Sequence, residues 1–571
     1  MPRRIFALVT ASVVALATLT LVSPAQAADP PSAGDPDYSF GNGGKLTMSF
    51  TNAVGVYDDY ANAIAVYPDG RFVVAGAAKG NPLVDNTYQF GVVRFNADGT
   101  RDSSFGTDGV VLTNNGLFHD RATAVVIQPD GKIVVSGYCF GDDFFTIRLN
   151  QNGSLDSSFG SGGKVTTDFS GQNDQAHGVH LQGDDKIVVT GWAATGPDNA
   201  GKQYAAVRYL ANGSIDTSYG TNGKVLVPMG TSGDGNGSTI QPDGKVVIAG
   251  RTLNSPGVYG VGLVRLTTSG SLDSGFGAGG RVLTSFGPKD ETLTAVAMQP
   301  DGRIVATGNA QWGSYFDTTA LRLLPNGSLD GSFGSGGMLR ANVSPDNDTG
   351  HALLVRPDGR IVIAGSYYGD GNDMYVARFW PSGARDIEFG RNGVTRMEMS
   401  KKYDEAFGVA SQGTKLIAVG RSFNGKDNDW ALIRVHDGPG LAGARRYPVS
   451  FARPGKRIKA TRLQALVGNA NTTSLSRVDV AFLKVNKKLL RKRKKCDWVT
   501  AGGRSVRLSA ARVNGKLVCA DAYWNQVVGT DSWNIRLRNF KPGTYRIKAR
   551  AMTPFGQLGL ESTRKLRVTR G

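Results

Sequence analysis

The sequence predicts an all-β protein in which a seven-bladed β-propeller, with four strands in each blade, is followed by a small basic β-sandwich. Three observations support this fold class. The stretch Gln128–Gly137 is one of seven related copies with a period of about 57 residues. Each repeat carries four strand-like runs separated by Gly-, Asn- and Asp-containing turns. After Gly440 the repeat stops and the chain becomes strongly basic.

The recurrent stretch reads Gln-Pro-Asp-Gly-Lys-Ile-Val-Val-Ser-Gly in its second copy. Pro129 fixes φ for a turn, Gly131 accepts a positive φ, and a β-branched run follows, so the stretch predicts a hairpin turn and a strand. The other copies are Tyr67–Gly76, Gln182–Gly191, Gln241–Gly250, Gln299–Gly308, Arg356–Gly365 and Ser411–Gly420, the copies at 182 and 411 being degraded. Seven copies predict seven blades.

The four runs of a repeat differ in composition, and this predicts their order within a blade. In the second copy they are Ala122–Gln128, Lys132–Gly137, Phe145–Leu149 and Gly163–Phe169. The first run is rich in small residues, which suits a crowded strand beside a central channel. The second is continuously apolar, as expected for a strand covered on both faces. In the third copy, Pro228 lies at the end of the fourth run. Because proline in a sheet belongs on an edge strand, we expect this run to be outermost.

The array begins and ends with incomplete repeats. It opens with a lone fourth run, Lys45–Phe50, and closes with a first-to-third set that ends at Trp430–Val435. We expect Lys45–Phe50 to complete the seventh blade and close the ring, because closure removes exposed sheet edges. The predicted propeller therefore spans residues 37–437.

Residues 1–27 combine Arg3 and Arg4, an apolar run and an Ala-x-Ala site before Ala28, the pattern of a cleaved secretory signal peptide. No second apolar run approaches the ~20 residues of a membrane span. We therefore expect a secreted protein that is extracellular or associated with the cell surface. Residues 438–448 have the Gly, Ala and Pro content of a linker.

The two domains have opposite charge. Gly440–Gly571 holds 30 Lys and Arg against 5 Asp and Glu, whereas the repeat region holds 33 against 42. Self-repulsion in so basic a domain predicts an anionic partner, either a cell-envelope polymer or extracellular nucleic acid. The densest run of positive charge comprises Lys487, Lys488, Arg491, Lys492, Arg493, Lys494 and Lys495.

Short strand-like runs and an Asn514-Gly515 hairpin signal predict a small β-sandwich over residues 449–571. In an oxidising exterior we expect Cys496 and Cys519 to form a disulfide bond in this domain, which contributes roughly 3 kcal/mol. The third cysteine, Cys139, is then expected to be a half-buried free thiol.

Two side chains recur in every repeat. An aromatic residue is expected to be a wedge between blades, contributing roughly 1.5–3 kcal/mol when fully buried. An arginine recurs on the third run, where pairing with a nearby aspartate such as Asp102 or Asp156 is favoured over a ring of anion ligands. The aromatic residues are Phe40, Phe105, Phe159, Tyr219, Phe276, Phe333 and Phe389, and the arginines are Arg94, Arg148, Arg208, Arg265, Arg322, Arg378 and Arg434.

A third recurrent slot carries a carboxylate just before each first run, where seven such groups would ring one mouth of the channel. Two interpretations stay open. In the favoured one, each carboxylate caps its own turn through backbone N–H groups. In the other, the mouth binds a cation or a basic ligand, with calcium as the candidate ion. The carboxylates are Asp59, Asp120, Asp174, Asp234, Glu291, Asp348 and Asp404.

The common catalytic motifs are absent from the sequence, which contains no G-x-S-x-G, H-E-x-x-H or C-x-x-C pattern. His177 and His180 look like a pair of metal ligands. In a regular strand, however, positions three apart face opposite sides, so we expect that they do not hold one metal together.

The strings Gln-Pro-Asp-Gly-Lys-Ile-Val-Val-x-Gly, Val-x-Arg-Leu and Gly-Ser-Leu-Asp-x-Ser-Phe-Gly-x-Gly-Gly resemble the bacterial delta-60 repeat family over about residues 37–437. The resemblance implies an exported or surface repeat protein without a defined reaction. The order of runs is also similar to the NHL-type propeller blade. Lys541–Ala551 resembles a late strand of an immunoglobulin- or fibronectin-like domain.

These features favour an exported, non-enzymatic binding or adhesion scaffold. Its basic domain would associate with an anionic envelope polymer, and its propeller would present a ligand face. The alternative is a propeller enzyme, of the carbohydrate or lactone hydrolase or lyase type, that uses mouth carboxylates and a bound cation. In a third hypothesis the basic domain folds against the acidic mouth of the propeller.

Overall fold

The computed structural model describes residues 32–438, except 51–57, 80–87, 116–118, 140, 142, 198–199, 256 and 369–370, together with the strands of residues 449–571. The predicted signal peptide lies outside the described residues, as does the predicted linker after residue 438. The described part of the chain contains no helix that is long and apolar enough to cross a membrane.

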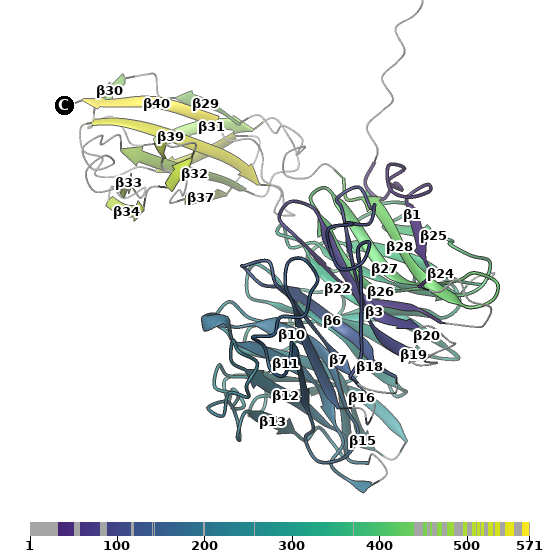
Figure 1. Cartoon of the computed structure of the whole chain (residues 1–571). Coiled ribbons are helices and arrows are strands. Elements are labelled where there is room, and N and C mark those ends of the chain that lie inside the picture. Colours follow the sequence, from purple (N-terminus) through teal and green to yellow (C-terminus); the bar gives the residue numbers. More distant parts are fainter. Residues whose placement is uncertain are drawn as a thin grey trace, which may run out of the picture. The chain divides into compact units, whose positions relative to one another are not determined.

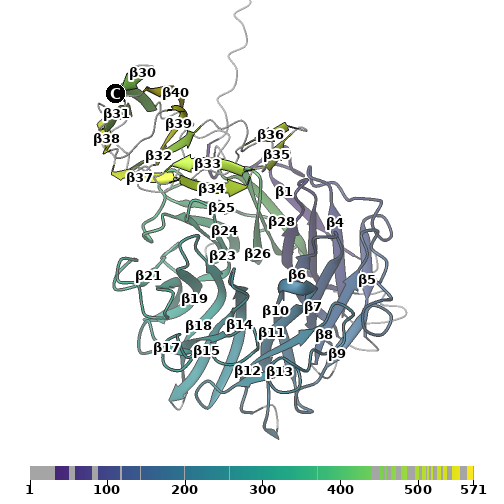
Figure 2. The same ribbon diagram turned by 90° about the vertical axis from the view of Figure 1, so that its left-hand side faces the viewer.

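Residues 32–438 form seven four-stranded antiparallel sheets, which are the blades of a β-propeller (Figures 1 and 2). Blade 1 contains β2 (Tyr60–Val66), β3 (Phe72–Lys79), β4 (Tyr88–Phe95) and β5 (Val110–Thr113); blade 2 contains β6 (Arg121–Ile127), β7 (Ile133–Tyr138), β8 (Phe144–Leu149) and β9 (Lys164–Thr167); blade 3 contains β10 (Asp174–Leu181), β11 (Ile187–Ala193), β12 (Gln203–Tyr209) and β13 (Lys224–Val227). A single-turn 3-10 helix, η1 (Gly183–Asp185), joins β10 to β11.

The remaining blades follow the same order. Blade 4 contains β14 (Ser232–Ile240), β15 (Val246–Ser255), β16 (Val258–Leu266) and β17 (Arg281–Thr284); blade 5 contains β18 (Glu291–Met298), β19 (Ile304–Trp312), β20 (Tyr315–Leu323) and β21 (Met338–Arg340); blade 6 contains β22 (Asp348–Val355), β23 (Ile361–Tyr368), β24 (Asn372–Phe379) and β25 (Val394–Met397); blade 7 contains β26 (Asp404–Gln412), β27 (Lys415–Phe423), β28 (Asn428–His436) and β1 (Lys45–Met48).

The first strand of each blade is innermost, as the composition of the runs predicted. Each first strand contacts the first strand of the next blade, and β26 of blade 7 contacts β2 of blade 1, so the ring is closed. The second and third strands are almost wholly buried, with β3 and β8 as examples. The hydrophobic core is therefore divided into clusters between neighbouring blades, such as the one that joins Val92 and Phe105 of blade 1 to Ile133 and Phe145 of blade 2.

The N-terminal strand closes the ring, which confirms the prediction from the sequence. β1 pairs antiparallel with β28, and Lys45 lies opposite Ile433 while Met48 lies opposite Trp430. The turn before β1 also supplies blade 7 with Asp37 and Phe40, which take the place of the aspartate and aromatic residue that follow the third strand in the other blades.

An arginine, an aspartate and an aromatic ring form what we call the interblade triad, and each blade has one. In blade 2, Arg148 Nε lies 2.7 Å from Asp156 Oδ2, and its guanidinium lies 4.7 Å from the centre of the Phe159 ring. Arg148 Nη1 donates a hydrogen bond of 2.5 Å to the carbonyl of Ala211 in blade 3. Because the arginine reaches into the next blade, the triad joins neighbouring sheets. The structural interpretation of the recurrent arginines is confirmed.

The aromatic member of the triad is fully buried in every blade, as predicted for a wedge. It packs against the glycine of the next blade's turn, for example Phe105 against Gly153. Gly153 has φ of +87°, and a Cβ atom there would lie 2.6 Å from the backbone nitrogen of Gly106. The amide of Gly106 donates a hydrogen bond of 2.8 Å to the carbonyl of Asn152 at the same joint. This turn position therefore needs glycine both for its backbone angle and for interblade packing.

The triad aspartates are held in their ionised form. Burial raises the pKa of Asp156, but hydrogen bonds from Ser158 and Lys132 and the charge of Arg148 outweigh this effect, and the pKa falls well below its ordinary value. The same balance lowers the pKa of Asp102 to about 2 and that of Asp330 to about 2.

The C-terminal region contributes the strands β29 (Val449–Arg453), β30 (Arg457–Lys459), β31 (Ala465–Ala470), β32 (Arg477–Lys484), β33 (Lys495–Val499), β34 (Ser505–Ser509), β35 (Ala511–Val513), β36 (Lys516–Val518), β37 (Trp524–Val528), β38 (Ser532–Arg536), β39 (Gly543–Met552) and β40 (Ser562–Thr569). β35 pairs with β36 on either side of Asn514-Gly515, as the hairpin signal predicted. β39 lies between β32 and β40, and β29, β31 and β38 form a separate three-stranded sheet.

Deletion of residues 37–50 tests the closure of the ring. It removes β1 and also leaves the buried Arg434 without Asp37, so we expect the free energy of unfolding to fall by roughly 5 kcal/mol or more. Thermal unfolding of the chain from residue 28 and of the deletion variant measures this, with removal of residues 28–31 as the control. An unchanged melting temperature in the deletion variant would show that β1 does not close the ring.

The triad aspartates also predict a loss of stability in acid. Because their pKa values are lower in the folded chain than in the unfolded chain, their contribution is present above about pH 4 and is lost as the pH falls towards 2. We expect Asp156→Asn to destabilise the protein by about 3–5 kcal/mol at pH 7, since it weakens a buried pair. Between pH 5 and pH 2 this variant should lose less further stability than the wild type. Parallel stability curves from thermal unfolding in this range would contradict the assignment.

Candidate functional site

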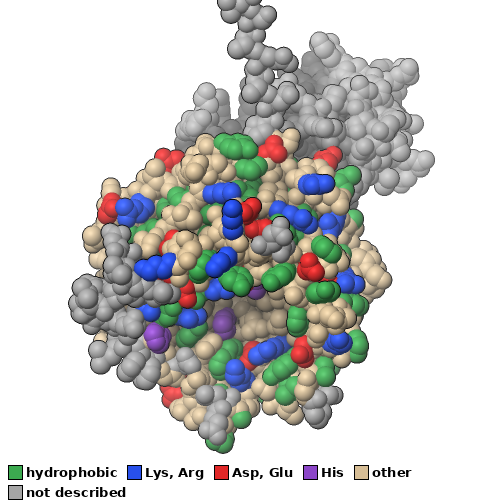
Figure 3. All heavy atoms as spheres, turned by 90° about the vertical axis from the view of Figure 1, so that its right-hand side faces the viewer, with side chains coloured by type: hydrophobic (Ala, Val, Ile, Leu, Met, Phe, Trp, Pro, Cys, Tyr) green, Lys and Arg blue, Asp and Glu red, His purple; other side chains and the backbone are tan. Residues whose placement is uncertain are grey.

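One face of the propeller is hollowed near its middle, and histidine, basic and acidic side chains are visible in and around the hollow (Figure 3). The innermost strands surround the centre of the ring. Each of them carries a β-bulge after its first residues, where one extra residue has no partner on the second strand. The extra residues are Asn62, Thr123, His177, Asn236, Thr294, His351 and Phe407.

Several bulge residues connect the innermost strand of one blade with that of the next. Asn62 Nδ2 donates a hydrogen bond of 2.8 Å to the carbonyl of Ala122, and Thr123 Oγ1 donates one of 2.6 Å to the carbonyl of Ala176. The Asn and Thr side chains at the bulges thus bind the ring together at its centre rather than serving as free polar groups.

The bulge removes the premise of the sequence argument about His177 and His180, whose expectation that they do not share a metal stays untested. That argument assumed a regular strand, but the register of β10 shifts between Ala176 and Gly178, so His177 stands outside the strict alternation of faces. His180 Nε2 lies 2.7 Å from Ser238 Oγ of blade 4. Burial lowers the pKa of both histidines to about 4, so both imidazoles are neutral at pH 7.

Most of the seven mouth carboxylates cap the turn that leads into their own strand, which confirms the favoured interpretation for them. Asp348 Oδ2 accepts the backbone N–H groups of Val343 at 2.6 Å and Ser344 at 2.9 Å. Asp120, Asp174, Glu291 and Asp404 accept such bonds in their own turns, and Asp59 accepts them from Phe50 and Lys79.

Asp234 differs from the others, because it pairs with Arg251 and lies 3.3 Å from Lys202 Nζ. Within the described residues, no three of the seven mouth carboxylates lie close enough together to share one metal ion.

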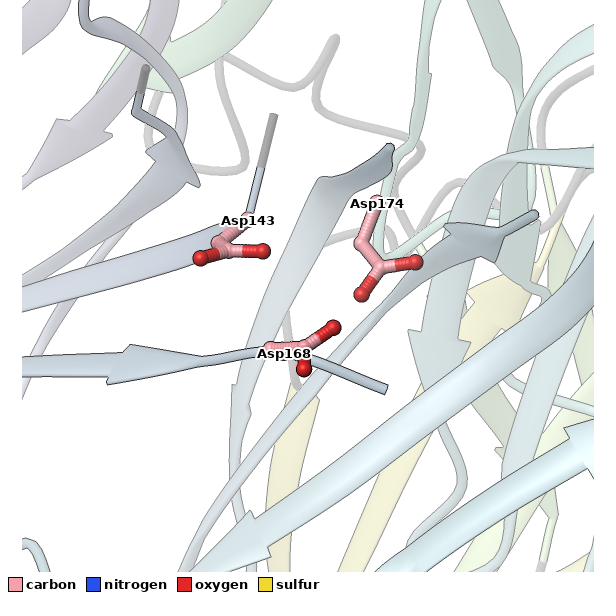
Figure 4. A group of neighbouring side chains, drawn as sticks. All are labelled: Asp143, Asp168 and Asp174. Carbon is pink, nitrogen blue, oxygen red and sulfur yellow. The ribbon is translucent and has the colours of Figure 1, made fainter. Parts of the chain in front are cut away.

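Among the described residues, Asp174 is the one of the seven that lies in a group of three carboxylates close enough to share an ion, together with Asp143 and Asp168 (Figure 4). Asp143 precedes β8, Asp168 follows β9 and Asp174 begins β10, so the group lies where blade 2 passes into blade 3. One oxygen of each carboxylate lies within 4.8 Å of the others. Burial raises the pKa of Asp174 to about 7, opposed by the hydrogen bond from Phe169 and assisted by the charges of Asp168 and Asp143.

A second group, which the sequence analysis missed, lies at the same end of the innermost strands. The mouth cluster consists of Tyr60, Tyr88, Arg121 and Arg421, from blades 1, 2 and 7. The Arg121 guanidinium lies 5.1 Å from the centres of both tyrosine rings, and that of Arg421 lies 5.2 Å from the Tyr60 ring. All four side chains are partly exposed. Because three blades contribute to this cluster, no local sequence motif predicts it.

The side chains of the predicted polymer-binding residues, Lys487–Lys495, and of Cys496 and Cys519 lie outside the described residues. Cys139 is a free thiol, as expected, but it is buried rather than half-buried, with 2 % of its surface exposed. Burial raises the pKa of this thiol to about 11.

Comparisons with solved structures give distant similarities only. A protein of unknown function from Dyadobacter fermentans has a TM-score of 0.35 and 10 % identity, covering 69 % of this chain and 97 % of its own. A polysaccharide lyase described as an ulvan lyase has a TM-score of 0.37 and 10 % identity, covering 67 % and 96 %. A putative glycoside hydrolase from Parabacteroides distasonis has a TM-score of 0.28 and 10 % identity, covering 70 % and 98 %. Scores this low support no inference about activity.

No curated protein matches the chain. One family model does match it, described as a domain of unknown function (DUF5122) beta-propeller, over residues 68–105, 128–159, 182–219, 241–276, 299–333 and 356–389. Each matched segment lies in one blade and ends at or close to the aromatic residue of its interblade triad. The repeats of this chain are therefore similar to those of the DUF5122 beta-propeller family.

Proposed function

We propose that this protein is an exported, non-enzymatic binding or adhesion scaffold. Its C-terminal domain, folded as a basic immunoglobulin-like β-sandwich, associates with an anionic polymer of the cell envelope, and its propeller presents a ligand face. The observation that carries the proposal is the division of charge, with 30 basic and 5 acidic residues in Gly440–Gly571 against 33 and 42 in the repeats. A basic domain joined to an acidic one directs its attraction for polyanions to one end of the chain.

The propeller supports a binding role through the mouth cluster, a group of side chains that is not repeated from blade to blade. The interblade triads recur in every blade and serve the fold. Single arginines lie over an aromatic ring in other blades as well, as Arg251 does over Tyr259, but among the described residues only the mouth cluster combines two arginines with two tyrosines. Among the described residues, Arg121 contacts the two tyrosine rings through its guanidinium face and has no hydrogen-bond acceptor. Guanidinium N–H groups bind carboxylate, sulfate or phosphate, the groups that give a saccharide its negative charge. The mouth cluster therefore suits an anionic saccharide.

Cell-wall sedimentation with the full mature chain tests the role of the basic domain. We expect the wild type to sediment with isolated cell walls at low salt and to be released as salt rises, because exposed charges are screened within about 10 Å at 0.1 M. Replacing Lys492, Arg493 and Lys494 by Gln should weaken binding by at least tenfold, since each charge contributes up to ~1 kcal/mol near an anionic surface.

The matched control replaces three exposed basic residues of the propeller, Lys289, Arg391 and Lys401, by Gln and should leave binding unchanged. No binding at low salt, or equal losses in the two triple variants, would refute the proposal. Salt-sensitive binding to duplex DNA without any retention on walls would instead identify nucleic acid as the partner.

Substitution of Arg121 tests the ligand face of the propeller. We expect Arg121→Gln to weaken binding of a carboxylated oligosaccharide by about tenfold, because the substitution removes one charge-assisted hydrogen-bond donor. Arg281→Gln on β17 of blade 4 is the control. Binding can be followed by calorimetry with the full chain. Equal affinity of the wild type and Arg121→Gln would show that the mouth cluster does not bind the saccharide.

A further inference from the structure

We propose that a pocket beside blade 6 binds a small molecule through a tetrahedral oxyanion, that is, a phosphate or sulfate group. We call it the seam pocket, because the N-terminal segment meets blade 6 there. Its volume is about 880 Å³, within the ~300–1,000 Å³ range of small-molecule sites. The proposal depends on neither the basic C-terminal region nor the mouth cluster. The lining of the seam pocket includes Gly34, Asp35, Val343, Arg385, Arg391 and Arg396.

The N-terminal segment contributes to this pocket because it replaces the next blade at one joint of the ring. Between blades 1 to 6, the amide after each triad aromatic donates to a carbonyl of the following blade, as Gly334 does to Ser382 at 2.9 Å. In blade 6 the equivalent amide, that of Gly390, donates to the carbonyl of Ala33 at 2.8 Å. The residues that follow Ala33 then line the pocket. The surroundings of blade 6 therefore differ from those of blades 1 to 5.

Two guanidinium groups converge on one short stretch of backbone at the seam pocket. Arg385 Nη2 donates a hydrogen bond to the carbonyl of Asn342, and Arg396 Nη2 donates one to the carbonyl of the next residue, Val343. Burial and the charge of Arg396 lower the pKa of Arg385, opposed by the charge of Asp348. The two arginines therefore lie close enough for each to act on the charge of the other.

Blade 1 also carries an arginine at the position of Arg385, and there an aspartate neutralises it. Arg101 Nη2 lies 2.7 Å from Asp108 Oδ2. In blade 6 the residue equivalent to Asp108 is Asn392, which has a similar positive φ, 55° against 51°. Arg385 Nη1 donates only to the backbone carbonyl of Asn392, at 3.5 Å. The fold does not require an arginine here, because blades 2 to 5 have the apolar residues Leu155, Ile215, Leu272 and Leu329.

Blade 5 offers the same comparison for Arg396. Its Arg340 bonds to Asp317, with Nε 2.6 Å from Oδ2. Arg396 and Asp373 occupy the equivalent positions in blade 6. There Asp373 accepts the O–H of Tyr367 at 2.7 Å, and the Arg396 guanidinium lies 4.5 Å from the centre of the same ring. Burial raises the pKa of Asp373, which the charge of Arg396 opposes only in part. Within the described residues, no carboxylate lies at ion-pair distance from Arg396.

The acidic groups near the seam pocket do not balance its arginines. Asp35 is the acidic residue among those that line it, and its Oδ2 accepts the N–H of Ser32 at 2.6 Å. Asp348 acts on Arg385 through its charge, but its Oδ2 already accepts two backbone N–H groups. Arg391 adds an exposed positive charge that the other repeats lack. The residues at its position in blades 1 to 5 are Thr107, Ser161, Thr221, Ala278 and Ser335.

Two converging guanidinium groups suit a tetrahedral oxyanion better than a carboxylate. One guanidinium alone can bind both oxygens of a carboxylate through a bidentate pair of hydrogen bonds. A phosphate group offers three strong acceptor oxygens, which is enough for two guanidinium groups. Arg385 and Arg396 each use Nη2 on a backbone carbonyl and have further N–H groups for a ligand. The remaining volume of the pocket would hold the molecule that carries the oxyanion.

Calorimetry with inorganic pyrophosphate tests the proposal on the full chain from residue 28. The chain in which Gln replaces Lys492, Arg493 and Lys494 is the reference protein, because the basic C-terminal run also attracts anions. In 0.15 M salt, where exposed charges are screened within about 8 Å, we expect one saturable site. Sulfate should compete for this site, whereas citrate, which has only carboxylates, should compete about tenfold less well.

A substitution that neutralises Arg385 without removing an arginine decides where the anion binds. Asn392→Asp supplies blade 6 with the aspartate of blade 1, and Asp108 shows that this backbone position accepts aspartate. We expect it to weaken pyrophosphate binding by about tenfold, because the ligand then competes with an ion pair. Asn222→Asp is the matched control at the same position of blade 3, where φ is 53°, and should leave the affinity unchanged.

Four results would overturn the proposal: no saturable binding of pyrophosphate or sulfate, unchanged affinity in Asn392→Asp, an equal loss in Asn392→Asp and Asn222→Asp, or citrate binding as tight as that of pyrophosphate. Thermal unfolding without the anion checks that both variants fold like the reference protein. If Asn392→Asp has a lower melting temperature, Arg396→Gln decides the question, and unchanged affinity in that variant would refute the site.

Discussion

The fold depends on the interblade triad, in which an arginine reaches from one blade to the next. Arg148 pairs with Asp156 in its own blade and donates to a backbone carbonyl of the following blade. A buried guanidinium is tolerable only when its charge and its N–H groups have partners. No blade can provide all of these partners alone, so each blade is completed by its neighbour. The last triad, with Arg434 and Asp37, requires the N-terminal turn, and this links ring closure to the same chemistry.

Repetition also separates the groups that serve the fold from those that can serve binding. The triads, the wedge aromatics and most mouth carboxylates occur at equivalent positions and have partners within the structure. Among the described residues, the mouth cluster and the convergence of Arg385 with Arg396 occur at one place each. A ligand that binds one side of a ring needs such local differences, because identical blades would offer seven equal sites.

The sequence predicted the order of strands because residue composition follows burial. Small residues in the first run, an apolar second run and Pro228 at the end of a fourth run were enough to place the strands from the centre to the edge. The pairing of Arg148 with Asp156 followed from recurrence and opposite charge. The argument about His177 and His180 assumed a regular strand, and a β-bulge is a departure from regular geometry that residue type alone does not reveal.

The repeat, the seven blades, the closure by β1 and the contrast in charge between the repeats and the C-terminal region could all be predicted from the sequence. These follow from periodicity and composition, which can be counted along the chain. The side chains that meet across blades could be identified only once the fold was known. Asp143 and Asp174 are separated by a full hairpin and a crossing turn, and Arg421 reaches Tyr60 only because the ring closes. Such contacts depend on strand register and on ring closure, and no local pattern of residues encodes them.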